Sequence, residues 1–261
     1  MNKQPESKQK NLIKPGTIWQ LDEHRLAYGD ARDKKLLERL IGDTHVNLLC
    51  CDVPYGVAVA ESKRGFKTLS KDKAVANDHL QSDAEYRKFT REWLEAVTPF
   101  LARRNAAYIF NADKMVWALR EGMLEADFKV AQLLVWVKSQ AVVGRLDYAP
   151  AHELILYGWH GVHKFRRSKD KSVLFYPRPT KSKMHPTTKP IGLIRRLILN
   201  STDIGDTVYD GFLGSGTTLL AAEQTKRRCF GVELDLEYVL IAVERWEKLT
   251  GKQAKIIYEA K

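Results

Sequence analysis

The chain lacks any hydrophobic run long enough to cross a membrane. None of its apolar stretches reaches the roughly 18 residues that a membrane-spanning helix needs. Residues 1–10 are polar and contain no apolar stretch of the kind found in signal peptides. We therefore expect a cytoplasmic protein with no membrane partner. Hydrophobic residues make up 44% of the 261 residues, which is enough for a large core in one α/β domain.

Cysteine is scarce as well. The three cysteines, Cys50, Cys51 and Cys229, have no paired spacing of the kind that zinc sites use. All three lie in apolar segments that we expect to be strands, where a reduced cysteine behaves as a small hydrophobic residue. We expect neither a disulfide nor a bound metal.

Acidic residues are too few to balance the basic ones, and the formal net charge is +11. The excess is concentrated in two segments, His163 to Lys183 and Glu61 to Lys73. Clusters of this kind suit a polyphosphate partner such as DNA, although a solvated basic surface would look similar. The residues that we expect to contact DNA are Lys63, Arg64, Lys67, Arg166, Arg167, Lys181 and Lys183.

Short apolar segments alternate with amphipathic ones along the chain. Strands are predicted at 46–51, 106–110, 131–137, 153–157, 207–209 and 229–232, and a short apolar stretch at 24–28. Helices are predicted around 36–41, from Ser82 towards Leu101, and at 114–124, 190–198, 217–225 and 238–249. This alternation predicts an α/β fold with a doubly wound, mostly parallel sheet and helices on both faces.

The same sequence patterns indicate the domain organisation. We expect one domain over residues 1–261, with residues 1–11 as a disordered tail. Two polar, lysine-rich segments, 56–81 and 138–185, are too long for plain connections and are predicted to be loops or insertions that contact DNA. We expect Trp93, Trp117, Trp136 and Trp246 to pack in the core.

A glycine turn without the third glycine of a dinucleotide-binding fingerprint follows the strand at 207–209. Gly214 and Gly216 precede a helix, but Leu219 stands where the fingerprint requires glycine or alanine, which argues against NAD. Glu233 ends the next strand, where an acid accepts hydrogen bonds from ribose hydroxyls. Asp210 precedes the turn and can accept from a ligand ammonium. A ligand with an ammonium, a ribose and no pyrophosphate fits S-adenosylmethionine. A tight turn without a ligand is the alternative.

The segment Asp52-Val53-Pro54-Tyr55 follows a buried strand near the other end of the chain. An aromatic amine is a poor nucleophile because its lone pair is delocalised into the ring. The carboxylate of Asp52 and the carbonyl of Val53 would accept its two N–H groups, and Tyr55 would stack on a base flipped from the duplex. In isolation, the same residues also fit a simple turn that closes a strand.

With these motifs in this order, the sequence resembles the β-class amino DNA methyltransferases, which modify adenine N6 or cytosine N4. The resemblance extends from about His24 to Gly251. It also rests on the segments Gly29-Asp30, Trp136-Val137-Lys138, 152–157 (HELILY) and 185–190 (HPTTKP). It implies a Rossmann-like methyltransferase fold, S-adenosylmethionine as cofactor and DNA as partner. It places Asp30 near the adenine of the cofactor and Lys189 near its carboxylate. The cofactor pocket would then comprise Asp30, Lys189, Asp210, Phe212, Gly214, Ser215, Gly216, Thr217 and Glu233.

One residue departs from the family motif, because Val53 replaces its first proline. The role at that position belongs to the backbone carbonyl, which valine keeps, and Pro54 still biases Val53 towards an extended backbone. The sequence therefore predicts a DNA methyltransferase of a restriction-modification type that acts on adenine N6. Cytosine N4 and a catalytically weakened DNA-binding relative remain alternatives, as does methylation of an RNA base or a protein amide. Dimerisation is common in the family.

Overall fold

Strands and helices alternate along the chain. The computed structural model describes residues 13–56, 81–141, 147–166, 169–177 and 189–259. The strands are β1 (Ile18–Leu21), β2 (His24–Tyr28), β3 (Val46–Asp52), β4 (Leu101–Asn111), β5 (Phe128–Val137), β6 (His152–His160), β7 (Val162–His163), β8 (Val173–Phe175), β9 (Thr207–Asp210), β10 (Arg228–Glu233) and β11 (Lys255–Tyr258). The helices are α2 (Lys34–Ile41), α4 (Asp83–Val97), α5 (Val116–Glu125), α6 (Ile191–Ser201), α7 (Thr217–Gln224) and α8 (Leu236–Thr250), and a short 3₁₀ helix, η1, covers Thr98–Phe100.

The strands form one sheet in the order β11-β1-β2-β10-β9-β3-β4-β6-β5-β8, with β7 pairing with β4 beside it. The central strands β2, β10, β9, β3 and β4 run parallel to one another. Strand β6 runs antiparallel to both β4 and β5, and β1 runs antiparallel to its two neighbours. The parallel centre is buried on both faces, which is why β3 is almost continuously apolar.

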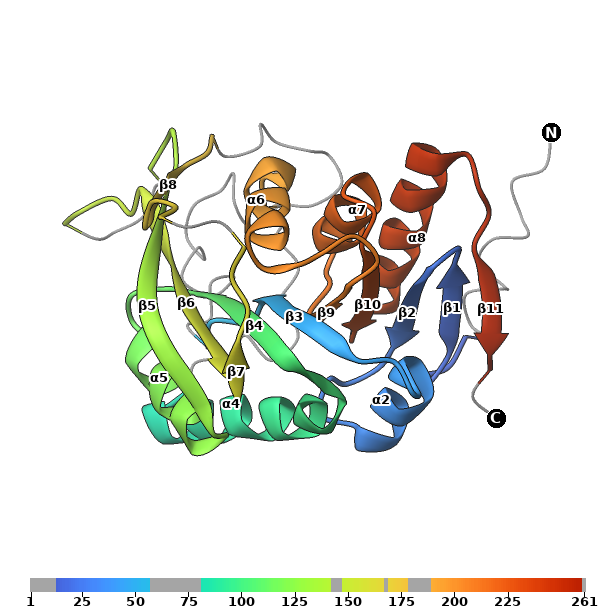
Figure 1. The fold of residues 1–261 in the computed structure, drawn as a ribbon, viewed down its shortest axis with the longest axis horizontal. Helices are drawn as coiled ribbons and strands as arrows, with labels where there is room; N and C mark the ends of the chain where they lie inside the picture. The colour runs from blue at the N-terminus through green and yellow to red at the C-terminus, as the bar shows by residue number, and fades with distance from the viewer. Residues whose placement is uncertain (1–12, 57–80, 142–146, 167–168, 178–188, 260–261) are drawn as a thin grey trace.

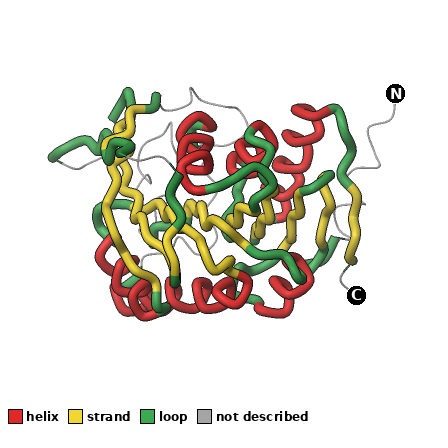
Figure 2. The backbone as a smooth tube through the Cα atoms, in the orientation of Figure 1, coloured by secondary structure: helices red, strands yellow, loops and turns green. Residues whose placement is uncertain are grey.

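Helices cover both faces of the sheet. Helices α2, α4 and α5 lie on one face and α6, α7 and α8 on the other (Figure 1, Figure 2). Each layer encloses its own hydrophobic core, with Trp93 fully buried in the first and Trp246 in the second. The prediction of a doubly wound, mostly parallel sheet is confirmed.

Helix α4 begins as the sequence indicates and ends earlier than expected. The Ser82 side chain accepts from the backbone N–H of Glu85, and the Glu85 carboxylate accepts from the backbone N–H of Ser82, which forms a capping box. The α-helix ends at Val97, and Leu101 already belongs to β4. Pro99 explains the early end, because proline has no N–H to continue the helical hydrogen bonds.

One further expectation, on Trp117, is corrected by the fold. Trp117 is 70% exposed, because α5 turns Val116, Ala118 and Leu119 towards the core and leaves Trp117 on its outer face. Within the segment 138–185, which we expect to hold loops or insertions, the structure contains β6, β7 and β8, and β6 includes the strand predicted at 153–157. No helix within the described residues is long and apolar enough to span a bilayer.

Candidate active site

The carboxyl ends of the central strands meet along one edge of the sheet. Asp52 is the last residue of β3, and Asp210 is the last residue of the neighbouring strand β9. The chain leaves β3 towards β4 on one side and leaves β9 towards β10 on the other. Such a switch point leaves a crevice outside the strand ends, where doubly wound folds bind ligands.

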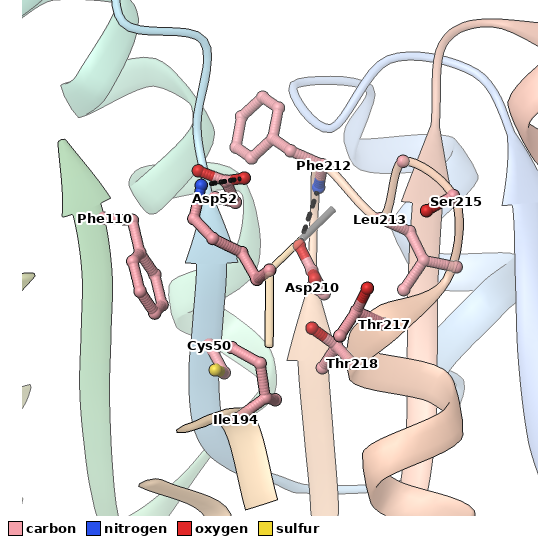
Figure 3. A pocket seen from close by; sticks show the side chains of 12 residues that line it. Cys50, Asp52, Phe110, Ile194, Asp210, Phe212, Leu213, Ser215, Thr217 and Thr218 are labelled. Carbon is pink, nitrogen blue, oxygen red and sulfur yellow. Dashed lines mark hydrogen bonds and ion pairs between the residues drawn. The ribbon is translucent and has the colours of Figure 1, made fainter. Parts of the chain in front are cut away.

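A pocket of about 50 Å³ occupies this switch point. It is lined from both predicted motifs, with Asp52 on one side and Asp210 and the turn through Gly214 on the other (Figure 3). The full lining is Cys50, Asp52, Phe110, Lys189, Ile194, Asp210, Phe212, Leu213, Gly214, Ser215, Thr217 and Thr218. The two motifs, which lie more than 150 residues apart in the sequence, therefore share one cavity.

Both carboxylate oxygens of Asp52 have a donor. The Lys189 ammonium lies 2.6 Å from Oδ2, and the Tyr55 hydroxyl donates to Oδ1 at 3.0 Å. Burial raises the pKa of Asp52, and the positive charge of Lys189 opposes that effect. Burial and the neighbouring carboxylates raise the pKa of Tyr55 well above its ordinary value, so its hydroxyl stays protonated and acts as a donor.

The turn after Asp52 is fixed by packing and by a hydrogen-bonded chain. The Val53 side chain is buried in the core on the α4 side of the sheet. The Pro54 carbonyl accepts from the hydroxyl of Tyr86 on α4, which in turn accepts from the Asn111 amide. A buried apolar anchor and this bond hold the backbone at Val53, the position where the family motif has proline.

The glycine turn is tied to the ends of β9 and β10. The Asp210 carboxylate accepts from the Phe212 N–H at 3.0 Å and from the Thr218 hydroxyl. The Glu233 carboxylate accepts from the Gly214 N–H at 2.7 Å and from the Asp235 N–H at 2.8 Å. These bonds point the carboxylates and the turn towards the same edge of the sheet.

Two of these carboxyl groups, those of Asp210 and Glu233, are buried. Burial raises the pKa of Asp210 to about 7, ahead of the opposing hydrogen bonds from Thr218 and Phe212. Burial also raises the pKa of Glu233. The donors to both acids are backbone N–H groups and a hydroxyl, so a cationic or hydroxyl-bearing ligand would relieve the cost of their burial.

This donor set fits S-adenosylmethionine, which carries an ammonium and a ribose with two hydroxyls. Asp210 can take the ammonium, and Glu233 at the end of the next strand can take the ribose hydroxyls. The turn presents open space at Gly214, where an added Cβ would meet nothing nearer than 4.0 Å. Ser215 and Thr217 add hydroxyls to the pocket wall.

The other predicted cofactor residues have these surroundings. Phe212 packs edge-on against Trp93 of α4, with ring centroids 5.4 Å apart. Asp30 follows β2, two strands away from β9, and its carboxylate accepts from Arg32 at 2.7 Å. Burial alone would raise the pKa of Asp30, but the hydrogen bonds from Arg32 outweigh it and lower that pKa. The ammonium of Lys189 lies against Asp52.

The predicted DNA-contacting residues are only partly covered by the structure. Lys63, Arg64, Lys67, Arg167, Lys181 and Lys183 lie outside the described residues. Arg166 is described: its side chain forms an ion pair with Asp203, and its backbone N–H donates to the carbonyl of Asn200 near the end of α6. That end of α6 is at the edge of the sheet opposite Asp52, so the fold does not bring Arg166 to the pocket.

Several residues of the site were not chosen from the sequence. Glu153 near the start of β6 forms an ion pair with Lys189, and a second one at 2.7 Å with Lys138 just after β5. The segments that contain Glu153 and Lys138 match the family, and both residues lie at strand ends, but nothing in the sequence shows that β5 and β6 are adjacent. Arg245 of α8 donates to the Ser215 hydroxyl at 2.8 Å and has no sequence signal of its own.

The three cysteines are free and buried in β3 and β10, as their apolar surroundings indicate. Within the described part of the chain, no group of three or more His, Cys, Asp or Glu side chains is arranged to hold a metal ion.

Comparison with known proteins gives a consistent result. A family model described as DNA methylase, for the N6 and N4 enzymes, matches residues 46–244. The type II methyltransferase M.HpaI of Haemophilus parainfluenzae is 27% identical over 230 residues, covering 78% of this chain and 68% of the relative. The type II methyltransferase M2.DpnII of Streptococcus pneumoniae is 26% identical over 222 residues, covering 77% and 82%.

Solved structures share the fold. The M1.HpyAVI–SAM complex is 24% identical, covers 84% of this chain and 98% of its own, and aligns with a TM-score of 0.62. The PvuII DNA methyltransferase, described as cytosine-N4-specific, is 18% identical, covers 92% and 93%, and aligns with a TM-score of 0.70.

Proposed function

The chain belongs to the N6/N4 DNA methylase family and is an S-adenosylmethionine-dependent DNA methyltransferase, and from this premise we propose that it methylates adenine N6 of a base flipped into the pocket at Asp52. The observation that carries the proposal is the shared pocket, which Asp52 and the turn through Gly214 line together. The relatives named above are type II methyltransferases, and we assign this chain to restriction-modification on that ground.

Each motif has a distinct role in this proposal. S-adenosylmethionine, when bound, would supply a methyl group on a positively charged sulfur that keeps the electron pair of the broken bond. The amine nitrogen would form the new bond to the methyl group and release one proton to the Asp52 carboxylate that accepts its N–H. Asp52 and the Val53 carbonyl accept the two N–H groups of the target amine, which turns its lone pair out of conjugation. Tyr55 stacks on the flipped base.

The cofactor is held on the other side of the pocket. Asp210 binds its ammonium, Glu233 binds its ribose, and Asp30 lies towards its adenine. The turn through Gly214, Ser215, Gly216 and Thr217, with Phe212 and Lys189, encloses the rest. The raised pKa of Asp210 and Glu233 supports these assignments, because both buried acids gain a partner when the cofactor binds.

The surroundings of Val53 favour an active enzyme over a catalytically weakened relative. Its side chain is buried, and the following carbonyl of Pro54 is held by Tyr86, so packing restrains the backbone where the family uses proline. The carbonyl acceptor is the same in both residues. We infer that catalysis does not require proline at this position.

The choice of adenine rests on the Asp-initiated motif, which within the family leans towards adenine. Cytosine N4 is the second candidate, because the structure described as a cytosine-N4-specific methyltransferase aligns with a TM-score of 0.70. Mass spectrometry of nucleosides from unmethylated, mixed-sequence DNA treated with the enzyme separates the two. N6-methyladenine is the expected product, and N4-methylcytosine would replace the first assignment with the second.

The decisive substitution is Asp52→Asn. We expect transfer of labelled methyl groups to DNA to fall by about a hundredfold or more, because a carboxylate acceptor becomes a neutral amide at the reacting nitrogen. Cofactor affinity, measured by calorimetry, should persist, because Asp210 and Glu233 are unchanged.

Asp43→Asn is the matched control for Asp52→Asn. Asp43 is exposed in the turn before β3, at the opposite edge of the sheet, so the same chemical change there should leave transfer unaltered. Undiminished transfer by the Asp52→Asn enzyme would refute the assignment of Asp52.

A further inference from the structure

A charged cluster adjoins Asp52 and includes residues that the proposed reaction has not used. Glu153 on β6 pairs with Lys189 at 3.0 Å through Oε2 and with Lys138 at 2.7 Å through Oε1. The Tyr55 hydroxyl also lies 2.7 Å from Glu153 Oε2. Asp52, Glu153, Lys138 and Lys189 thus form an alternating chain of two negative and two positive side chains.

Glu153 contacts the same two donors as Asp52. Lys189 lies 2.6 Å from Asp52 Oδ2 and 3.0 Å from Glu153 Oε2. The Tyr55 hydroxyl lies 3.0 Å from Asp52 Oδ1 and 2.7 Å from Glu153 Oε2. Tyr55 has only one hydroxyl proton, so it can satisfy only one of the two acids at a time.

The proposed reaction requires Asp52 to accept an N–H from the target amine, which then competes with Lys189 and the Tyr55 hydroxyl for the same carboxylate. Lys189 is only 8% exposed, and a buried ammonium cannot lose its counter-ion without a large cost. Glu153 is already within bonding distance of both donors and can keep them satisfied. Lys138, itself 7% exposed, holds the other oxygen of Glu153.

We propose that Glu153 is a positioning residue for methyl transfer, which takes over the Lys189 ammonium and the Tyr55 hydroxyl when the carboxylate of Asp52 binds the target amine. This inference rests on the proposed role of Asp52. Lys138 is the anchor that keeps Glu153 in place on its far side.

The electrostatics of the cluster agree with this geometry. Burial alone would raise the pKa of Glu153, but Lys189 and Lys138 together lower it to about 2, so Glu153 stays ionised. Burial alone would lower the pKa of Lys189, but Asp52 and Glu153 outweigh it and raise that pKa, so Lys189 stays charged. Phe110 and Trp136 lie beneath the Lys189 ammonium, with ring centroids 5.3 and 5.9 Å away.

The test compares Glu153→Gln with the wild-type enzyme in single-turnover methyl transfer. Glutamine keeps the shape of the side chain but removes the charge, so Lys189 remains on Asp52. We expect the transfer rate to fall roughly tenfold to a hundredfold, as for a misplaced reacting group. The cofactor dissociation constant, measured by calorimetry, should stay within about twofold of the wild type.

The pH profile separates positioning from a structural role. The charged groups that face Asp52 are Lys189 and Glu153, with the Tyr55 hydroxyl beside it and Asp210 across the pocket. Glu153 raises the pKa of Asp52, so its neutralisation should lower that pKa. We expect the acid limb of the rate profile to move to lower pH in Glu153→Gln while the plateau falls. A lower plateau with an unmoved acid limb would overturn the proposal.

Two further variants complete the design. Glu153→Asp keeps the charge and should recover part of the activity that glutamine loses. Glu125→Gln is the matched control, because Glu125 pairs with Arg87 on the outer helices far from the pocket, and it should transfer methyl groups at the wild-type rate. Thermal unfolding checks that each variant folds, and Glu153→Asp carries the test if glutamine does not fold.

The outcomes distinguish this inference from the proposed function. If Asp52→Asn loses transfer while Glu153→Gln keeps the wild-type rate, Asp52 is catalytic and the role of Glu153 is refuted. If Asp52→Asn retains full transfer, the proposed function fails first, whatever Glu153→Gln does.

Discussion

At the scale of single residues, the fold has a clear effect on the pKa of the Asp210 carboxyl group. Burial raises its pKa from 3.8 to about 7. The folded protein therefore holds the Asp210 proton more tightly than the unfolded chain does, and this contribution to stability is lost as pH rises from about 4 towards 7. The cost of the ionised, buried acid is offset when a cationic ligand binds it.

We predict that cofactor affinity rises with pH through about 7. A ligand ammonium binds ionised Asp210, so below its pKa the protein must release a proton on binding, and affinity falls by up to about tenfold per pH unit. Calorimetry with S-adenosylmethionine from pH 6 to pH 8 measures this slope. Asp210→Asn should bind more weakly and lose the slope, whereas an equal slope in both proteins would exclude Asp210 as its source.

At the scale of elements, Gly216 joins the glycine turn to the packing of two helices. Its backbone is left-handed, with φ at 84°, and it forms the N-cap of α7. An added Cβ would lie 2.9 Å from the Cβ of Ala242 on α8. The position therefore requires glycine both for its backbone conformation and for the approach of α8.

We predict that Gly216→Ala lowers the free energy of unfolding by about 2 to 5 kcal/mol, since a left-handed backbone costs about 1 to 2 kcal/mol and overpacking about 1 to 3 kcal/mol. Gly251→Ala is the matched control, because Gly251 is also left-handed, with φ at 73°, and has nothing within 4 Å of its added Cβ. The Gly251→Ala variant should lose only the free energy of unfolding that comes from the strained backbone. Chemical denaturation measures the free energy of unfolding of both variants. Equal losses in the two would show that the contact with Ala242 is unimportant.

At the scale of the whole molecule, charge dominates the encounter with DNA. The net charge is +11, and a basic protein releases counterions from the phosphate backbone as it binds. Of the residues assigned to DNA contact, Arg166 lies within the described segments but away from the pocket. The others lie outside the described segments. The total charge nevertheless acts on association over several ångströms.

We predict a steep dependence of DNA affinity on salt. Between 50 and 200 mM salt the affinity should fall by about a thousandfold, the loss that roughly six phosphate contacts produce. Fluorescence anisotropy with a labelled, mixed-sequence duplex measures it. Cofactor affinity provides the internal control, because it does not depend on phosphate contacts and should change little. A flat response of DNA affinity would argue against a phosphate-led interface.

Local sequence determined the element types and the two motifs. Buried parallel strands such as β3 appear as unbroken apolar runs, and the capping box at Ser82 marks the start of α4, because both signals depend on neighbours along the chain. The order of Asp52 before the glycine turn, together with the matching segments between them, also indicated the family, which the match over residues 46–244 establishes. Strands β1 and β11, which lie next to each other at one end of the sheet, were not predicted from the sequence.

Only the tertiary structure decided which side chains meet. Lys189 precedes α6 and Glu153 lies on β6, so their contact depends on strand order and helix placement, which no local pattern encodes. The exposure of Trp117 was decided in the same way, by which face of α5 turned towards the sheet. Local propensity acts between residues a few positions apart, whereas the charges around Asp52 come together through the packing of the whole sheet.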